Sequence, residues 1–505
     1  MMRSANQDLG PAGFAVRTGV RLRPDPSRIT IKLFVARQED FGPTQSRTNA
    51  VVRRVMALSD AEARTALEEI ERDFAFRHPD FDQWLDLNAH RALHRFDPKV
   101  PLSEDKWRMI GACFTHEFAL EGAALCNPSA VEHPDQSGLP PGTKRFVMST
   151  RAIGEGHRSA IGFRTGTIDA SGHVVVDGVR PEVHTGITSE TRMNKAAFRS
   201  LLEPAAPYAD NAAEVMSGLQ DTFSVSDLEE RLNVLHHDRD TYRNVEETLQ
   251  EFRLVAQRFY MSKFPSDVAV SERALWPHAD VERRGMEDAR FTRFTERDGS
   301  VAYFASYTAF DGVNITQQGL RTVDFTHFHA FPVSGDASRG KGLALFPRHV
   351  DGRYAALVRP DYESNQIAFS DSVEHWETSE TIQVPARPWE VIQLGNCGAP
   401  VETEAGWLVV THAVGPFRTY YLGAILLDRD DPQRVLGTLD QPLLSPAHDE
   451  RDGYVPNVVY SCGSMVHAGR LMIPFGIADH SIGIATVRME ELLGRLTGKE
   501  GKADR

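Results

Sequence analysis

The sequence predicts an all-β protein, best described as a β-propeller that carries helical additions. After residue 284 the chain contains many short apolar segments of about 6–10 residues, such as 301–310 and 406–414, separated by turns that contain glycine. Short strands at even spacing indicate a closed or radially repeated β architecture rather than βαβ units. Helical patterns in this half of the chain are too few to cover a parallel sheet.

An N-terminal extension, residues 1–100, precedes the β region. Residues 28–37 predict an isolated strand, and residues 49–93 have a helical pattern in which Ser59 and Glu62 form a capping box. Apolar residues recur there at helical spacing: Ala66, Leu67, Ile70 and Phe74. This apolar stripe either packs on its own chain or forms a contact between subunits of a homo-oligomer, and the pattern is compatible with both.

A second helical region interrupts the strands at about residues 189–264, where amphipathic helical patterns replace the short apolar segments. We interpret it as an insertion within a β-propeller domain that spans residues 101–490. A polar tail, residues 491–505, follows that domain.

Composition excludes several classes of partner. The chain has 505 residues, a net charge of −14 and a pI near 5.8, which argues against nucleic acid or an acidic membrane surface as a partner. The four cysteines show no metal-ligand spacing, and no apolar run approaches the ~20 residues that span a bilayer. The N-terminal sequence lacks the apolar core of a signal peptide, so we expect a cytoplasmic protein with reduced thiols.

The segment 284–291, RGMEDARF, places two acids between two arginines. If it enters a pocket as a strand, alternation sends Glu287 and Asp288 to opposite faces. One acid could then act on a substrate while the other anchors the loop. We expect Glu287 to be the anchor, accepting hydrogen bonds from the backbone or from Arg284.

Several segments resemble glycoside hydrolase family 130, the β-mannoside phosphorylases and related mannosidases. RGMEDARF is similar to the family's G-[IV]-E-D-P-R signature, and CNPS at 126–129 resembles its early N-P segment. Further segments follow in the family's order: FVMSTRAIGEGHRSAIG, GKGLALFPRHVDGRYAALVRP, PWEVIQLGNCGAPVETEAGWLVVTHAV, YLGAILLDRDDPQRVLG, GYVPNVVYSCG and FGIADHSIGIATV. The resemblance covers roughly residues 126–487 and implies a five-bladed β-propeller with the active site in its central pocket.

The chain departs from the family pattern at three places. The proline after the acid is Ala289, the K-D pair reads Lys341-Gly342, and the Y-H-G segment reads Thr411-His412-Ala413. These departures leave the implied fold intact and bear on the substrate preference.

The resemblance implies roles for individual residues. Asp288 corresponds to the proton donor, which acts through a substrate hydroxyl, and Asp479 corresponds to an aspartate that contacts the sugar; a capped turn is the alternative for Asp479. Asn127 either binds a sugar hydroxyl or caps a turn, and Arg151 serves the sugar or the anion. Candidates for binding phosphate are Arg321, Lys341, Arg359, His412 and Tyr420.

These residues fit an inverting phosphorylase that cleaves β-mannosides with inorganic phosphate and releases α-mannose 1-phosphate. Such an enzyme needs one carboxylic acid and a cationic site for the dianion, whereas a hydrolase normally needs two carboxylates. No metal or organic cofactor is implied; phosphate is a co-substrate and a mannose-containing oligosaccharide is the partner. The alternatives are a β-mannosidase and, in another class, a non-catalytic glycan-binding propeller.

One further motif suggests a metal site that we do not adopt. His327 and His329 alternate along a predicted strand, which places both imidazoles on one face, but only Asp324 offers a third ligand nearby. No cysteine lies close by in the sequence, so the pattern does not predict metal binding.

Overall fold

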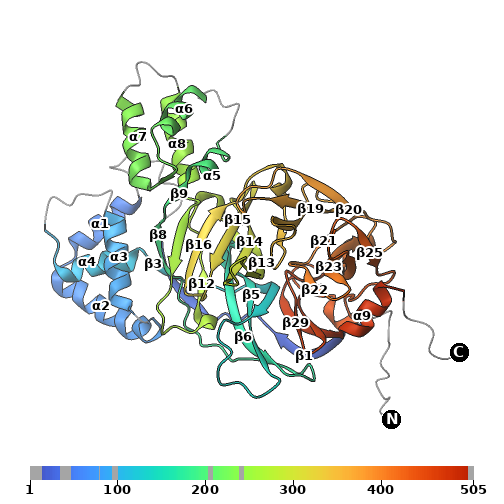
Figure 1. Ribbon diagram of the computed structural model, residues 1–505. Coiled ribbons are helices and arrows are strands. Elements are labelled where there is room, and N and C mark those ends of the chain that lie inside the picture. Colours follow the sequence, from blue (N-terminus) through green and yellow to red (C-terminus); the bar gives the residue numbers. More distant parts are fainter. Residues whose placement is uncertain are drawn as a thin grey trace, which may run out of the picture. The chain divides into compact units, whose positions relative to one another are not determined.

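The computed structural model describes residues 14–34, 47–78, 80–93, 101–202, 209–237 and 244–498, and the chain divides into two compact units. The helical unit comprises Asp25–Gly122 with Arg180–His184, and the β unit comprises the rest of the chain. Figure 1 shows mostly strands in the β unit, so the predicted all-β class holds for the larger part of the molecule. None of the helices in the described ranges is long and apolar enough to cross a membrane.

Within its described residues, the helical unit contains four α-helices and one strand pair. The helices are α1 (Arg47–Ala57), α2 (Asp60–Phe74), α3 (Phe81–Leu93) and α4 (Glu104–Cys113). The predicted capping box is confirmed, because the Glu62 amide donates to Ser59 Oγ at 3.2 Å and the Ser59 amide donates to Glu62 Oε2 at 2.7 Å.

The strand predicted at 28–37 is not isolated. It is β2 (Ile29–Leu33), and it pairs antiparallel with β3 (Thr115–Ala119), a partner that lies more than eighty residues later and has only a short apolar pattern of its own. Residues 35–37 of the prediction lie outside the described residues.

The β unit is built from five groups of antiparallel strands that follow one another along the chain. The first group contains β4 (Ala124–Glu132), β5 (Lys144–Ile153), β6 (Ser159–Ile168) and β7 (Val174–Val176). The second contains β13 (Gly285–Thr295), β14 (Val301–Phe310), β15 (Ile315–Thr322) and β16 (His327–Pro332). The short strand β12 (Ala274–Leu275) pairs with β6 of the first group. A parallel bridge between Gly285 and Ser159 joins the first and second groups into an eleven-stranded sheet.

The third and fourth groups form separate sheets. The third contains β17 (Ala344–Leu345), β18 (Tyr354–Val358), β19 (Asn365–Ser370) and β20 (Ser379–Gln383). The fourth contains β21 (Gln393–Asn396), β22 (Val401–Thr403), β23 (Gly406–Gly415), β24 (Thr419–Leu427) and β25 (Val435–Thr438).

The fifth group takes its outer strand from the other end of the chain. It contains β26 (Val459–Tyr460), β27 (Met465–His467), β28 (Arg470–Ile477) and β29 (Ser481–Arg488), and β29 pairs with β1 (Val16–Leu22). Helix α9 (Met489–Leu496) follows. The sequence assigned residues 1–100 to one extension, but the structure gives β1 to the last sheet, where Arg17 forms a two-pronged ion pair with Glu450 at 2.8 and 2.6 Å.

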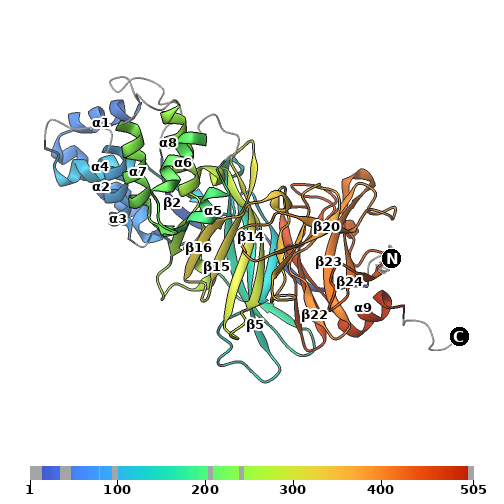
Figure 2. The same ribbon diagram turned by 45° about the horizontal axis from the view of Figure 1, so that its top comes forward.

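The helices at 195–256 lie where the sequence predicted an insertion. They are α5 (Lys195–Arg199), α6 (Ala209–Ser217), α7 (Val225–His237) and α8 (Val245–Ala256), with the small pair β9 (Met193–Asn194) and β10 (Thr222–Phe223). The flanking strands β8 (Ile187–Glu190) and β11 (Tyr260–Lys263) pair with each other, and β11 pairs with β16. Figures 1 and 2 show α5–α8 beyond this edge of the sheet, around their own buried core of Phe198, Phe223 and Phe252.

Residues from all five groups line one cavity of about 430 Å³. The lining residues lie on β4, β13, β22 and β27 and shortly after β17, and they include Val131, Phe291, Pro347, Val401 and Met465. The strand pairing does not itself close the groups into a ring, so the five-bladed propeller stays a prediction. The shared cavity shows that the five groups approach one another at these residues.

Candidate functional site

Asp288 lies at a β-bulge near the start of β13. The register between β13 and β14 shifts between Glu287 and Arg290, and Asp288 has φ +55°. The sequence predicted that Glu287 and Asp288 face opposite sides of the strand. This prediction is wrong, because the bulge breaks the alternation of side chains. Both meet Arg151, whose Nη2 lies 2.5 Å from Glu287 Oε1 and whose Nη1 lies 3.7 Å from Asp288 Oδ1.

The first group of strands also has a β-bulge, at Asn127. The register between β4 and β5 shifts between Cys126 and Ser129, and Asn127 has φ +48°. Its Nδ2 donates to Asp288 Oδ1 at 2.6 Å, while its Oδ1 is buried and has no hydrogen-bond partner among the described residues. Asn127 therefore orients the candidate acid and retains one acceptor for a ligand hydroxyl.

Glu287 connects two of the predicted binding residues. It accepts from Arg151 and, at 3.0 Å, from Lys341 Nζ. The expectation that Arg284 or the backbone would hold Glu287 is wrong, because the bulge turns the carboxylate toward Arg151 and Lys341. We call Asn127, Arg151, Glu287, Asp288 and Lys341 the carboxylate cluster.

The electrostatic environment separates the two aspartates. Burial favours the neutral form of Asp288, but Arg151, Lys341, Arg290 and the Asn127 amide outweigh it and lower the pKa of Asp288. Burial raises the pKa of Asp479 to about 6, and the charge of Asp288 adds to that effect although Arg151 and Arg418 oppose it. Asp288 is therefore ionised at neutral pH, whereas the raised pKa of Asp479 favours its neutral form more.

Arg290 is bound to neutral groups. Its Nη2 donates to the Tyr460 hydroxyl at 2.6 Å and its Nη1 donates to the backbone carbonyl of Asp288 at 3.2 Å, while its buried Nε has no partner among the described residues. Gly342, at φ +98°, leaves room in front of this group: a Cβ there would lie 3.8 Å from both Arg290 Nη2 and Asn396 Nδ2. A side chain at position 342 would thus be in contact with Arg290 and Asn396.

Arg359, like Arg290, is bound to a neutral side chain, that of His412. Arg359 Nη1 donates to His412 Nε2 at 3.1 Å, so the other ring nitrogen, Nδ1, carries the proton and donates to the Asn396 carbonyl at 3.0 Å. Burial and the charge of Arg359 lower the pKa of His412 well below its usual value, which keeps the ring neutral. Both ring nitrogens are engaged, so His412 positions Arg359 and has no free donor for an anion.

Two tyrosines complete this side of the site. The His412 ring lies 4.9 Å from the Tyr460 ring and 6.5 Å from the Tyr420 ring, between centroids. Burial raises the pKa of Tyr460, so its hydroxyl stays protonated. We call Arg290, Arg359, His412, Tyr420 and Tyr460 the arginine cluster.

Arg321, another predicted phosphate residue, is not brought together with these clusters. It is exposed on β15, opposite His329 on β16, and its guanidinium lies 5.8 Å from the centre of the Phe304 ring. The remaining predicted residues are those of the two clusters together with Asp479.

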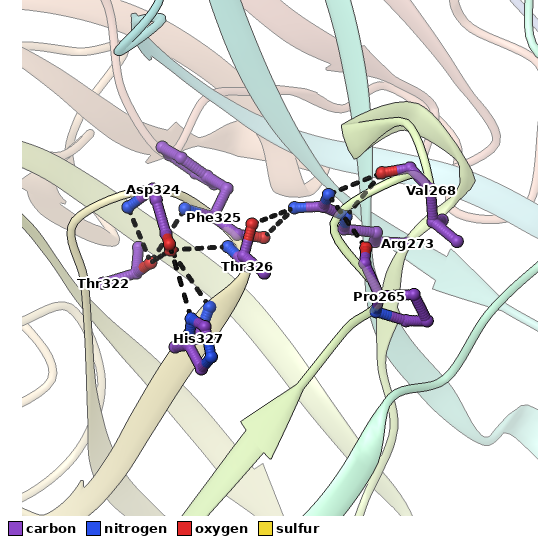
Figure 3. Close-up of polar contacts among 8 residues, drawn as sticks. All are labelled: Pro265, Val268, Arg273, Thr322, Asp324, Phe325, Thr326 and His327. Atoms are coloured by element: carbon purple, nitrogen blue, oxygen red, sulfur yellow. Dashed lines mark hydrogen bonds and ion pairs between the residues drawn. The ribbon is translucent and has the colours of Figure 1, made fainter.

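Figure 3 shows what the nearby Asp324 and His327 do. Asp324 accepts from the backbone amides of Thr326 and His327 at 2.8 and 3.1 Å, and from the His327 ring at 3.4 Å. Arg273 fastens the same turn to the loop before it, donating to the carbonyls of Phe325 and Val268. The Asp324 carboxylate thus serves a turn between β15 and β16.

The sequence predicted no role for Tyr460, Asn396 or Arg290. Tyr460 and Asn396 lie inside segments that were recognised, YSCG and GNCGAP. Both lie on the first strand of a group, β26 and β21, as Asn127 and Asp288 do, and this shared place is the signal that could have found them.

The geometry offers an ionised carboxylate held by an amide, next to arginines whose partners in the described residues are neutral. Such arginines are suited to bind an anion, because neither Arg290 nor Arg359 forms an ion pair with a carboxylate of the described residues. The unpartnered acceptor on Asn127 and the neighbouring Asp479 suit a polyhydroxylated ligand.

Comparisons with known proteins agree with this chemistry. The family model of glycoside hydrolase family 130, described as beta-1,4-mannooligosaccharide phosphorylase, matches residues 224–497. That match includes all predicted site residues except Asn127 and Arg151.

Individual relatives are similar over less than half of the chain. The 1,2-beta-oligomannan phosphorylase of Thermoanaerobacter sp. (strain X514) is 33% identical over 217 residues, 42% of this chain and 71% of the relative. The beta-1,2-mannobiose phosphorylase of Listeria innocua is 28% identical over 229 residues, 44% of this chain and 63% of the relative. A solved structure of the Listeria innocua enzyme with beta-1,2-mannobiose superimposes with a TM-score of 0.45 and 20% identity, over 75% of this chain and 93% of that one.

Proposed function

The chain belongs to glycoside hydrolase family 130, and on that premise we propose that it is an inverting phosphorylase of β-mannosides. Phosphate attacks the anomeric carbon, the glycosidic bond breaks, and α-mannose 1-phosphate forms. The observation that carries the proposal is the pairing of one ionised carboxylate, Asp288, with arginines that have neutral partners in the described structure.

We assign the phosphate to the arginine cluster. Arg359 and the Nε of Arg290 would donate to the dianion, and the space in front of Gly342 would admit it. His412 keeps Arg359 in place by accepting from its Nη1. Each charge-assisted hydrogen bond to a dianion contributes roughly 1.5–3 kcal/mol.

Phosphate binding would also prepare the acid. Arg151, Lys341 and Arg290 lower the pKa of Asp288, and a dianion beside Arg290 would offset part of their charge. The pKa of Asp288 then rises toward the range in which a carboxylic acid can donate. Asn127 holds Oδ1, so Oδ2 would deliver the proton, by way of a mannosyl hydroxyl, to the leaving oxygen.

The fold suits this assignment if the five strand groups are the five blades of a propeller. Asn127, Asp288, Asn396 and Tyr460 lie on the first strands of four groups, and Lys341 precedes the first strand of the remaining one. In a propeller the first strands of the blades surround one central channel.

Hydrolysis of the same linkage is the second candidate, and Asp479 is the observation that favours it. A β-mannosidase needs two carboxylates, and Asp479 is a second carboxyl within electrostatic reach of Asp288. Glu287 is less suited, because it is bound to both Arg151 and Lys341.

The reverse reaction tests the proposal. Incubation with α-mannose 1-phosphate and a panel of acceptors, β-1,2- and β-1,4-linked mannosides and free sugars, should release inorganic phosphate in proportion to new glycosidic bonds. No phosphate release with any acceptor would contradict the proposal.

We also propose that the protein self-associates through α2. Leu67 and Ile70 are only partly buried, and Phe74 is 39% exposed. Because deleting the N-terminal region would remove β1 from the last sheet, the test is substitution: Leu67→Glu with Ile70→Glu should lower the mass in solution, whereas Glu68→Lys, on the exposed side, should not. An unchanged mass, or a monomeric wild type, would contradict this proposal.

A further inference from the structure

Two turns in the β unit have the same backbone conformation although they join different strands. The turn between β5 and β6 contains Gly154–Arg158, and the turn between β23 and β24 contains Gly415–Thr419. The leading glycines have φ −110° and −111°, and the third residues, Gly156 and Phe417, have φ/ψ of 66°/24° and 57°/24°. The fourth residues, His157 and Arg418, are also left-handed at φ +57° and +52°.

Phe417 is anomalous in this turn. The left-handed conformation favours glycine and is strained for a bulky residue, and Gly156 occupies the equivalent place in the first turn. The side chain of Phe417 is 95% exposed, so it adds nothing to the core in return. A strained aromatic residue that contacts solvent and that the turn itself does not require points to a ligand.

The position of the turn identifies that ligand. The turn connects His412 on β23 with Tyr420 on β24, and both belong to the arginine cluster. The charge of the adjacent Arg418 reaches Asp479. Phe417 therefore stands at the rim of the candidate site, on the side of Asp479.

We propose that Phe417 is a stacking platform for a mannosyl ring of the oligosaccharide, beyond the two rings that flank the cleaved bond. This inference rests on the proposed function. The C–H face of a pyranose is apolar and packs on an aromatic ring, which has a large rigid surface and loses little side-chain entropy. Because its neighbours hold the reacting groups, Phe417 would select for chain length.

The test compares phosphorolysis of β-mannosides of two to six units by wild type, Phe417→Gly, Phe417→Trp and a control, Leu436→Ala. Leu436 is 41% exposed on β25, the outer strand of the same sheet. For Phe417→Gly, kcat/KM for trisaccharides and longer should fall five- to tenfold relative to kcat/KM for the disaccharide. Phe417→Trp and Leu436→Ala should keep the wild-type ratio.

Loss of folding can be distinguished from loss of sugar binding by thermal melting. Phe417→Gly relieves the left-handed strain, so this variant should melt at or above the wild-type temperature. An unchanged chain-length ratio in Phe417→Gly would overturn the inference while phosphorolysis stands. If wild type cleaves no β-mannoside, the proposed function fails, and the inference is then judged by titrating Phe417→Trp with β-mannotetraose. A saturable change in tryptophan emission, absent from wild type, would support it, and no change would overturn it.

Discussion

The cationic side chains of the two clusters have different kinds of partner. In the carboxylate cluster, Arg151 and Lys341 both bind Glu287, at 2.5 and 3.0 Å. In the arginine cluster, Arg290 binds a tyrosine hydroxyl and a backbone carbonyl, and Arg359 binds a neutral imidazole, with no carboxylate partner for either among the described residues.

The difference separates positioning from binding. Cations that are already paired hold Glu287 and Asp288 in place and gain little from another anion. Arginines that are fixed by neutral acceptors keep their charge and lose little freedom when a dianion arrives. The account predicts that substitutions in the two clusters will affect different kinetic constants.

The largest effect is expected for the acid. Asp288→Asn keeps the hydrogen bond geometry with Asn127 approximately but cannot supply a proton, so kcat should fall ~10²–10⁴-fold. Steady-state phosphorolysis with a β-mannoside measures it. Asp324→Asn, in the turn of Figure 3, is the matched control and should retain turnover. A folded Asp288→Asn protein with wild-type turnover would remove Asp288 from the mechanism.

Arg359→Ala and Lys341→Ala test whether the two clusters affect different kinetic constants. Loss of Arg359 removes a charge-assisted hydrogen bond to phosphate worth roughly 1.5–3 kcal/mol, which corresponds to about a 10- to 100-fold higher KM for phosphate. Its KM for the mannoside should change little. Lys341→Ala releases Glu287 and should raise both constants.

His412→Asn adds a check, because its effect should be smaller and should not add to that of Arg359→Ala. Equal changes in both constants for Arg359→Ala would erase the distinction between the clusters.

A smaller effect is expected on stability. The pKa of Asp479 is raised to about 6 in the folded protein, above its value in the unfolded chain, so the contribution of Asp479 to stability is present below the unfolded pKa and is lost as pH rises through about 6. Asp479→Asn removes the cost of the buried charge. It should therefore raise the free energy of unfolding by ~1–2 kcal/mol at pH 8, since one pKa unit corresponds to about 1.4 kcal/mol and the side chain is partly exposed.

At pH 4 the Asp479→Asn variant and wild type should be nearly equal. Denaturant unfolding at both pH values measures the difference. A variant that is less stable than wild type at pH 8 would show that the Asp479 charge is compensated in the fold.

The fold class and most of the cluster residues could be predicted from sequence, because short strands and ordered motifs are local signals. The partners of Glu287 could not, since the bulge at Asp288 breaks the alternation on which strand reasoning depends. The pairing of β1 with β29 joins opposite ends of the chain and has no local signal. The sequence predicted that His412 binds phosphate. Its tautomer, which leaves no free donor, is set by Arg359 and Asn396, and only the fold brings these residues to the ring.

The central claim is that phosphate, bound by the arginine cluster, is the nucleophile. The most direct measurement is product identity from a β-mannoside in phosphate-free buffer and in buffer with added phosphate. The account predicts α-mannose 1-phosphate that forms only with phosphate, at a rate that saturates with its concentration. Free mannose released at the same rate in both buffers would contradict the account and favour hydrolysis.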